Sequence, residues 1–297
     1  MALFTNNSSD TTHSLTISSS INQLCKGQDY IYIDDISDLV NEECRVCIIF
    51  DGHGGDSVIN FIRSIPNNKM NKLITKSNPI ETLSKYINNN ILYHNNYSSG
   101  STMCLVKIYS NRIECTNCGD SQVAILKNGK LEYMNQEHNY KNEKERERLK
   151  DKVNYIPSYN IKISSHDTLV SVYSEYIEWN TEDADLKLAC TQSIGHNDIT
   201  GFEPENKIIQ LVAGDKYKII LGSDGLWEMI MDDEIDIEQL YTKNANEIMK
   251  QTTDRWLQEW NMQDLLNNNT DIIKSKFTSK QCDDIAIIVA DINPILK

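Results

Sequence analysis

The chain has 297 residues, of which 39% are hydrophobic and 24% charged, a composition typical of a globular protein rather than a disordered or fibrous one. Acidic residues outnumber basic residues 43 to 29, which gives a formal net charge of −14. A protein that binds nucleic acid neutralises phosphates with clustered Lys and Arg, so this charge argues against a nucleic-acid partner. Cationic partners, metal ions included, suit the chain better.

No run in the sequence approaches the roughly 20 apolar residues that a membrane-spanning helix needs, and the first residues lack the features of a signal peptide. Eight cysteines without such a signal indicate reduced thiols. We therefore expect an intracellular protein, cytoplasmic or nuclear, with no membrane partner. No repeat or flexible linker divides the chain, which favours one domain over residues 14–297. Residues 1–13 are polar and lack periodicity, so we expect them to form a disordered arm. The protein is expected to be a monomer.

Short runs of β-branched and aromatic residues predict strands, and apolar residues at helical spacing predict helices between them. In chain order, the predicted elements are strands at Tyr30–Ile33 and Val46–Phe50, helices over 56–64 and 79–92, strands at Met103–Tyr109, Arg112–Thr116 and Val123–Lys127, a helix over 142–151, a strand at Tyr217–Leu221, a helix over 246–260 and a strand at Ile285–Ala290. The segment 139–187 carries the weakest signals.

Two of these predictions extend to particular side chains. In the helix over 246–260, Trp256, Leu257 and Trp260 are expected to form the buried side. The run Lys127–Tyr133 predicts a hairpin, because it contains an Asn-Gly pair at its centre. Hairpins among the strands favour antiparallel sheets with helices packed outside them, an α+β layered sandwich.

Two CxxC pairs, Cys44/Cys47 and Cys115/Cys118, raise the possibility of a zinc site. Both pairs lie in predicted strands, where residues three apart point to opposite faces. The distance between the pairs also fits no usual zinc spacing. These thiols are therefore interpreted as small core side chains.

An apolar run adjoins an aspartate at three places along the chain. The runs are CIIFDGHGG at Cys47–Gly55, KIILGSDGLWE at Lys218–Glu228 and QCDDIAIIVADI at Gln281–Ile292. Taken singly, each aspartate is more simply a turn former. Brought together at sheet ends, Asp51, Asp224 and Asp283 would form an oxygen-rich cleft of the kind that Mg²⁺ and Mn²⁺ prefer.

Six segments, in order, resemble the metal-dependent protein phosphatases, also called the protein phosphatase 2C family. They are DGHGG at Asp51–Gly55, SGST at Ser99–Thr102, NCGDSQ at Asn117–Gln122, LACTQSIG at Leu188–Gly195, SDGLWE at Ser223–Glu228 and CDDIA at Cys282–Ala286. The resemblance spans about residues 14–291. It implies a four-layer α-β-β-α sandwich, in which two packed antiparallel sheets are flanked by helices.

The same resemblance implies a site for two Mg²⁺ or Mn²⁺ ions at one end of the sandwich. Asp51 would bridge both ions, the Gly52 carbonyl would be a further ligand of one, and Asp224 and Asp283 would hold the other. Asp120, together with Asp224 and Glu228, matches a third and more weakly held metal site. Metal-bound hydroxide would attack the phosphorus of a phosphorylated protein, and His53 would protonate the departing Ser or Thr oxygen.

The pattern breaks in the segment LCKGQD, which stands where the family has an RxxxED element. Asp29 matches the Asp of that element, which helps to order metal-bound water. Gln28 replaces a metal-binding Glu, and Leu24 replaces the Arg that grips the substrate phosphate. Lys26 is a substitute for that Arg by hypothesis, because strand alternation would place it on the same face as Leu24.

Smaller departures affect two other motifs. Gln192 and His196 replace an Arg and an Asp of the family's TRSFGD segment, and Gln122 replaces the Arg of GDSR. Two functions remain open. The first is an active metal-dependent serine/threonine protein phosphatase, favoured by the complete set of central aspartates. The second is a pseudophosphatase, a binding module that keeps the fold, favoured by Leu24 and Gln28.

Overall fold

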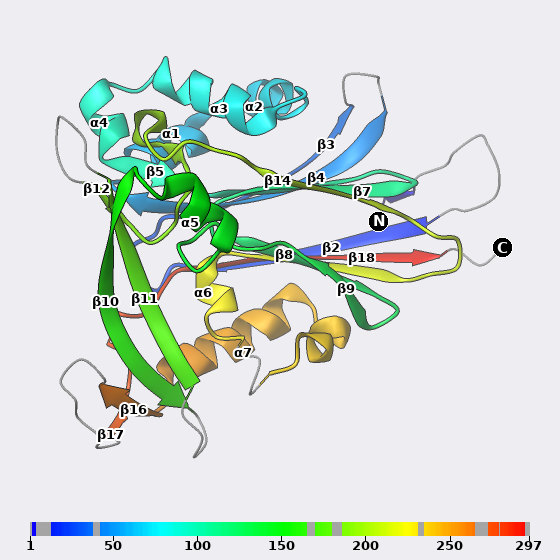
Figure 1. Ribbon diagram of the computed structural model, residues 1–297. Coiled ribbons are helices and arrows are strands. Elements are labelled where there is room, and N and C mark those ends of the chain that lie inside the picture. The colour runs from blue at the N-terminus through cyan, green and yellow to red at the C-terminus, as the bar shows by residue number, and fades with distance from the viewer. Residues whose placement is uncertain are drawn as a thin grey trace.

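The computed structural model describes residues 2–3, 13–37, 42–164, 170–179, 186–230, 235–264, 273–278 and 280–294. Two antiparallel sheets stack on each other, and helices cover their outer faces (Figure 1). The first sheet has the strand order β1 (Ala2–Leu3), β2 (His13–Asn22), β18 (Ile285–Pro294), β15 (Tyr217–Gly222), β8 (Gln122–Lys127) and β9 (Lys130–Met134). Helices α6 (Asp224–Trp227) and α7 (Ala245–Leu257) and the 3₁₀ helix η2 (Ile237–Thr242) accompany it.

The second sheet has seven strands. Their order is β13 (Ile194–Gly195), β5 (Ser99–Ser101), β4 (Glu43–Gly54), β6 (Met103–Ile108), β7 (Arg112–Cys118) and β14 (Glu205–Gln210), with β3 (Asp29–Ser37) also paired to β4. Helices α1 (Ser57–Ser64), α2 (Asn67–Ile74), α3 (Pro79–Asn88) and α4 (Tyr93–Tyr97) lie over this sheet (Figure 1). The predicted α+β sandwich of four α-β-β-α layers is therefore confirmed.

A third sheet of five strands was not predicted. It has the order β12 (Leu186–Leu188), β11 (Val170–Trp179), β10 (Val153–Ser164), β16 (Trp260–Asp264) and β17 (Ile273–Ser275). In Figure 1 the hairpin of β10 and β11 stands across one end of the sandwich. Helix α5 (Glu143–Leu149) contributes Leu149 to a small core that it forms with side chains of β11 and β12.

Alternation along β4 builds two layers of core at once. Val46, Ile48 and Phe50 pack toward the helices α1–α3. Cys47 and Ile49 pack between the two large sheets. Successive side chains of a strand point to opposite faces, so one apolar run serves both layers.

The four CxxC cysteines follow the same alternation. Cys44 and Cys118 lie in the helix-side core, whereas Cys47 and Cys115 lie between the sheets. The members of each pair thus face opposite sides of the sheet, as predicted. All four thiols are buried, which confirms their interpretation as core side chains.

The helix predicted over 246–260 needs a correction. Its N-terminus is a capping box formed by Asn244 and Glu247, but the helix ends at Leu257, and Trp260 begins β16. Trp256 and Trp260 are buried, as predicted, while Leu257 is 51% exposed. Adjacent helical residues point about 100° apart, so a helix that buries Trp256 turns Leu257 toward solvent.

Two further local predictions can be compared with the structure. The Asn-Gly hairpin is confirmed, since Asn128 and Gly129 form a two-residue turn with φ angles of 51° and 85°. Helix α3 begins at Pro79 with Asn78 as its cap, but it ends at Asn88 rather than at residue 92. Three consecutive Asn residues, which are weak helix formers, account for the earlier end.

Most of the predicted arm over residues 1–13 lies outside the described residues. The described part, Ala2–Leu3 and His13, lies in the paired strands β1 and β2. No helix of the described residues is long and apolar enough to cross a membrane.

The core between the sheets generates a stability prediction. Ile288 of β18 has no exposed surface in this core, so Ile288→Ala should lower the free energy of unfolding by about 2–5 kcal/mol. Leu257→Ala, at the exposed end of α7, is the matched control and should change it by less than about 0.5 kcal/mol. Denaturant unfolding followed by circular dichroism measures both, and equal losses would contradict the assigned burial.

Candidate metal and phosphate site

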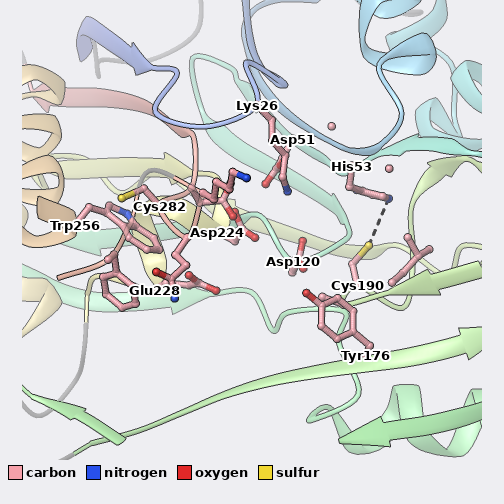
Figure 2. Close-up of a pocket in the computed structure, with 18 of the residues that line it drawn as sticks. Lys26, Asp51, His53, Asp120, Tyr176, Cys190, Asp224, Glu228, Trp256 and Cys282 are labelled. Carbon is pink, nitrogen blue, oxygen red and sulfur yellow. Dashed lines mark hydrogen bonds between the residues drawn. The ribbon is translucent and has the colours of Figure 1, made fainter. Parts of the chain in front are cut away.

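A cavity of about 580 Å³ opens between the third sheet and the end of the sandwich. It lies where the chain reverses after β4, β7 and β15 and before β18. The predicted site residues that line it are Lys26, Asp51, Gly52, His53, Asp120, Asp224, Glu228 and Asp283. In Figure 2, Asp51 and Asp120 lie between a group formed by Asp224 and Glu228 and a second group formed by His53 and Cys190.

Asp51 is held near the end of β4 by its neighbours on both sides. On one side the strand register places it opposite Asp29 of β3. On the other side the Thr102 N–H donates to the Asp51 carbonyl at 2.8 Å, and the Asp51 N–H donates to Thr102 Oγ1 at 3.2 Å. Thr102 is in turn hydrogen-bonded to Ser121 at 2.7 Å. The SGST segment therefore fixes the backbone from which Asp51 projects.

Asp224 and Asp283 come from adjacent strands. Asp224 opens α6 directly after β15, Asp283 precedes β18, and β15 and β18 pair side by side. Glu228 follows Asp224 by four residues, which places both on one face of a helical turn. Asp120 sits in the β7–β8 turn, next to the Gly119 N–H, which donates to Nδ1 of the buried His138 at 3.1 Å.

The pKa values of these five carboxyl groups are all shifted upward. Burial, followed by repulsion from neighbouring carboxylates, raises the pKa values of Asp51, Asp120 and Glu228 well above their usual range. Burial also raises the pKa of Asp224, and with repulsion from Asp224 it raises that of Asp283 to about 7. Desolvation and like charges both disfavour an ionised carboxyl. Cations at this position would relieve both effects.

Lys26 lies in a loop, not in a strand, so the alternation argument made for it was wrong. The loop is shaped by the Asp284 carboxylate, which accepts hydrogen bonds from the N–H groups of Cys25 at 2.8 Å, Lys26 at 3.2 Å and Gln28 at 2.8 Å. Leu24 packs against the core beside α7, whereas Lys26 lines the cavity. Burial lowers the pKa of Lys26, but attraction to Asp283, Asp224 and Asp51 outweighs it, and the net change is upward.

Gln28 and Asp29 are both buried behind the cavity wall. The Gln28 side-chain amide donates to Asp56 Oδ1 at 2.6 Å, while its Oε1 has no hydrogen-bond partner among the described residues. Asp29 Oδ2 accepts a hydrogen bond from Ser223 at 2.7 Å. Burial raises the pKa of Asp29 well above its usual range.

The donor atoms suit a hard divalent cation. Within the described residues, two buried acceptors of the predicted site, Gln28 Oε1 and Asp224 Oδ1, have no hydrogen-bond partner. Oxygen ligands of this kind are preferred by Mg²⁺ and Mn²⁺. As they stand, however, no three His, Cys, Asp or Glu side chains of the described residues form a complete metal-binding group. The residues therefore fit a divalent cation by the type of their donor atoms.

His53 lies at the opposite side of the cavity from Glu228 (Figure 2). Its Nε2 is 3.7 Å from Cys190 Sγ, and its ring stacks on that of His196. Burial, followed by electrostatic interactions with His196 and with the Lys26 ammonium, lowers the pKa of His53 well below its usual value. A hydrogen bond to the backbone of Asp51 acts in the opposite direction.

Sequence reasoning did not assign Cys190, His196 or Asp284 to the site. Cys190 and Asp284 lie within the LACTQSIG and CDDIA segments, and His196 directly follows the first of these. Their roles were missed because their contacts are made with segments far away in the chain. The two other residues that depart from the family motifs, Gln192 and Gln122, make hydrogen bonds within the fold. Gln192 binds Glu145 at 2.7 Å, and Gln122 donates to the carbonyl of Asn135 at 2.9 Å.

Comparison with known proteins finds similarity in sequence and in fold. Protein phosphatase 1B of Bos taurus is 24% identical over 217 residues, covering 65% of this chain and 42% of that protein. A sex-determining protein of C. elegans aligns with 93% of this chain and 64% of its own, with a TM-score of 0.58 and 14% identity. Serine-threonine phosphatase 2C from Toxoplasma gondii aligns over 95% of both chains, with a TM-score of 0.55 and 12% identity. The two structural alignments show that this chain shares its fold with those proteins.

A four-layer α+β sandwich with a carboxylate-lined cavity at one end defines the class of protein. Residues 30–254 match the model of the protein phosphatase 2C family, and the chain belongs to that family. It spans about half the length of the curated relatives it matches.

The raised pKa of Asp283 generates a pH prediction. This carboxyl titrates at about 7 in the folded protein and near 4 in the unfolded chain, so the folded state binds more protons between these pH values. Its contribution to the free energy of unfolding therefore falls as pH rises from about 4 to about 7. In chelator, Asp283→Asn should remove this loss and melt higher than the wild type above about pH 6.

Thermal unfolding with chelator and with Mn²⁺ measures this effect. Added Mn²⁺ should stabilise the wild-type protein more than Asp283→Asn, because the variant has lost a proposed ligand. Asp254→Asn, at an exposed position of α7, controls for the loss of one charge. The same response to pH and Mn²⁺ in both variants would contradict the special position of Asp283.

Proposed function

We propose that this chain is a metal-dependent phosphatase that hydrolyses phosphoserine and phosphothreonine in proteins. One observation carries the proposal: Asp51, Asp224 and Asp283, from separate parts of the chain, line a single cavity with His53 on its wall. Family membership supports the same activity. The free thiols of all eight cysteines suit a reducing compartment, cytoplasmic or nuclear.

The carboxylates would hold two Mg²⁺ or Mn²⁺ ions. When bound, such ions supply a hydroxide near neutral pH and neutralise phosphate charge. Asp51 would bind both ions, with the Gly52 carbonyl on one and with Asp224 and Asp283 on the other. Gln28 would contribute Oε1, which lacks another partner among the described residues. Asp120, Asp224 and Glu228 would hold a third ion more weakly.

Other side chains would act on the substrate. The Lys26 ammonium faces the same cavity and would attract the phosphate as a point charge, without the two-pronged contact of an Arg. Asp29, fixed by Ser223, would orient water through its remaining oxygen. His53 would donate a proton from Nε2 to the departing Ser or Thr oxygen. A phosphate dianion in the cavity favours the protonated form of His53, opposing the effect of burial.

A second candidate function is that of a pseudophosphatase, a binding module with weak or no turnover. Two observations favour it. Leu24 packs against the core and, as an apolar side chain, cannot bind phosphate, and the Gln28 amide donates to Asp56. A neutral Gln in place of a carboxylate weakens metal binding at that position.

Turnover distinguishes the two functions. With millimolar Mn²⁺, we expect hydrolysis of p-nitrophenyl phosphate and of a phosphothreonine peptide, and we expect chelator to abolish it. Asp224→Ala should lower kcat by about 100-fold or more, since it removes a proposed ligand and its charge. Asp254→Ala, an exposed carboxylate on α7, should leave turnover intact. Absence of turnover at any metal concentration would leave only the binding role.

Gln28→Glu tests the role of the neutral ligand. The added charge should strengthen Mn²⁺ binding and lower the Mn²⁺ concentration that gives half-maximal activity by about tenfold. Because the new carboxylate would lie against Asp56, the same change should be made with Asp56→Asn to remove that repulsion. Isothermal titration calorimetry measures affinity independently of turnover. Unchanged affinity in both backgrounds would reject Gln28 as a metal ligand.

A further inference from the structure

A second histidine lies directly behind His53. The rings of His53 and His196 stack, with 5.1 Å between their centroids and 23° between their planes. His196 has no exposed surface, so its ring does not contact solvent. On the cavity side, Cys190 Sγ lies 3.7 Å from Nε2 of His53 (Figure 2). The His53 imidazole is thus confined between a buried ring and a thiol.

The His196 ring is fixed at its own end. Its Nδ1 lies 2.7 Å from the Tyr97 carbonyl oxygen, so Nδ1 carries the proton and donates it. That leaves Nε2 with a lone pair, and Nε2 has no hydrogen-bond partner among the described residues. A buried polar atom without a partner is costly, and it calls for an explanation in the function of the residue.

The backbone that presents His196 is unusual. His196, Asn197 and Asp198 are consecutive non-glycine residues in the left-handed region, with φ angles of 48°, 50° and 60°. L-residues avoid this conformation. Side chains of α3 and α4 hold the turn in place. Asp198 accepts from Asn88 at 2.5 Å and from Ser84, and Asn197 accepts from Asn96 at 2.8 Å.

Gly100 of β5 makes room for both rings. A Cβ atom at this position would collide with Cδ2 and Nε2 of His196 and lie 2.8 Å from Nε2 of His53. Any residue other than glycine would therefore push one or both rings away. The packing around the two histidines is specified from three sides: β5, the left-handed turn and Cys190.

We propose that His196 is a positioning residue for His53, whose anchored ring stacks on the His53 imidazole and fixes the direction in which Nε2 faces the cavity. The inference rests on the proposed phosphatase function, in which Nε2 of His53 donates a proton to the leaving oxygen. A general acid must lie within hydrogen-bond reach of the atom it protonates. An imidazole free to rotate meets that requirement for only part of the time.

Two substrates that differ in their need for a proton test the proposal. p-Nitrophenolate leaves without protonation, whereas the alkoxide released from a phosphothreonine peptide requires it. The variants are His196→Asn, His53→Gln and the double variant, since Asn tolerates the left-handed conformation of residue 196. His94→Asn makes the same substitution at an exposed histidine of α4 and is the matched control.

The measured quantity is the ratio of kcat for the peptide to kcat for p-nitrophenyl phosphate. His196→Asn should lower this ratio about tenfold or more, with KM changed little. His53→Gln should lower it further, and the double variant should be no worse than His53→Gln, because His196 acts through His53. The ratio should not change in His94→Asn. Equal losses on both substrates, or losses that multiply in the double variant, would overturn the proposal.

A second measurement separates this inference from the proposed function. If the wild-type protein hydrolyses neither substrate with Mn²⁺, the phosphatase function fails, and the position of His53 can still be measured by NMR. The ring C–H resonances of His53, assigned by their loss in His53→Gln, should carry the ring-current shift of the stacked His196. That shift should disappear in His196→Asn and persist in His94→Asn. Unchanged His53 resonances in His196→Asn would refute the positioning role.

Discussion

Repulsion among carboxylates is the constraint on which the arrangement of this protein depends. Two unit charges 4 Å apart repel by about 4 kcal/mol at an effective dielectric of about 20, a large part of the roughly 5–15 kcal/mol that stabilises a domain. Hydrogen-bond donors hold the carboxyl groups in place: the Ser223 hydroxyl donates to the Asp29 carboxylate, and the Asp284 N–H donates to that of Asp283. The Thr102 N–H donates to the backbone carbonyl of Asp51 and so fixes the strand from which that side chain projects. The sheets thus keep together groups that would otherwise separate.

Asp284 links this acidic cavity to the loop that departs from the family pattern. Its carboxylate gathers three N–H groups from Cys25, Lys26 and Gln28, which turns Lys26 toward the cavity and Gln28 behind it. One anchor therefore sets the position of both substituted residues. Phosphate binding would therefore differ from the family pattern in two ways. An ammonium would replace a planar guanidinium, and it would approach the phosphate from a loop.

The sequence was informative wherever one segment contains its own signal. Alternation predicted that Cys44 and Cys47 face opposite sides of their strand, and an Asn-Gly pair predicted a hairpin. Aspartates next to apolar runs predicted Asp51, Asp224 and Asp283 of the cavity. Prediction failed where the outcome depends on distant segments. Lys26 was assigned to a strand because nothing local shows that Asp284 bends the chain there. The third sheet was missed because β10 has a break in register near Pro157 and pairs with β16, far along the chain.

The left-handed turn at residues 196–198 bears on the choice between an enzyme and a binding module. Three L-residues in this conformation cost about 1–2 kcal/mol each, and the hydrogen bonds that hold Asn197 and Asp198 return about 1 kcal/mol each. Glycine at 196 would lower that cost, and a scaffold has no need of the imidazole. Backbone strain of this kind is retained where the side chain that the strained segment presents has a function. His196 stacks on His53, the proposed general acid, and is shielded from solvent. The strained turn therefore supports an enzyme, in which the orientation of His53 matters, over a binding module.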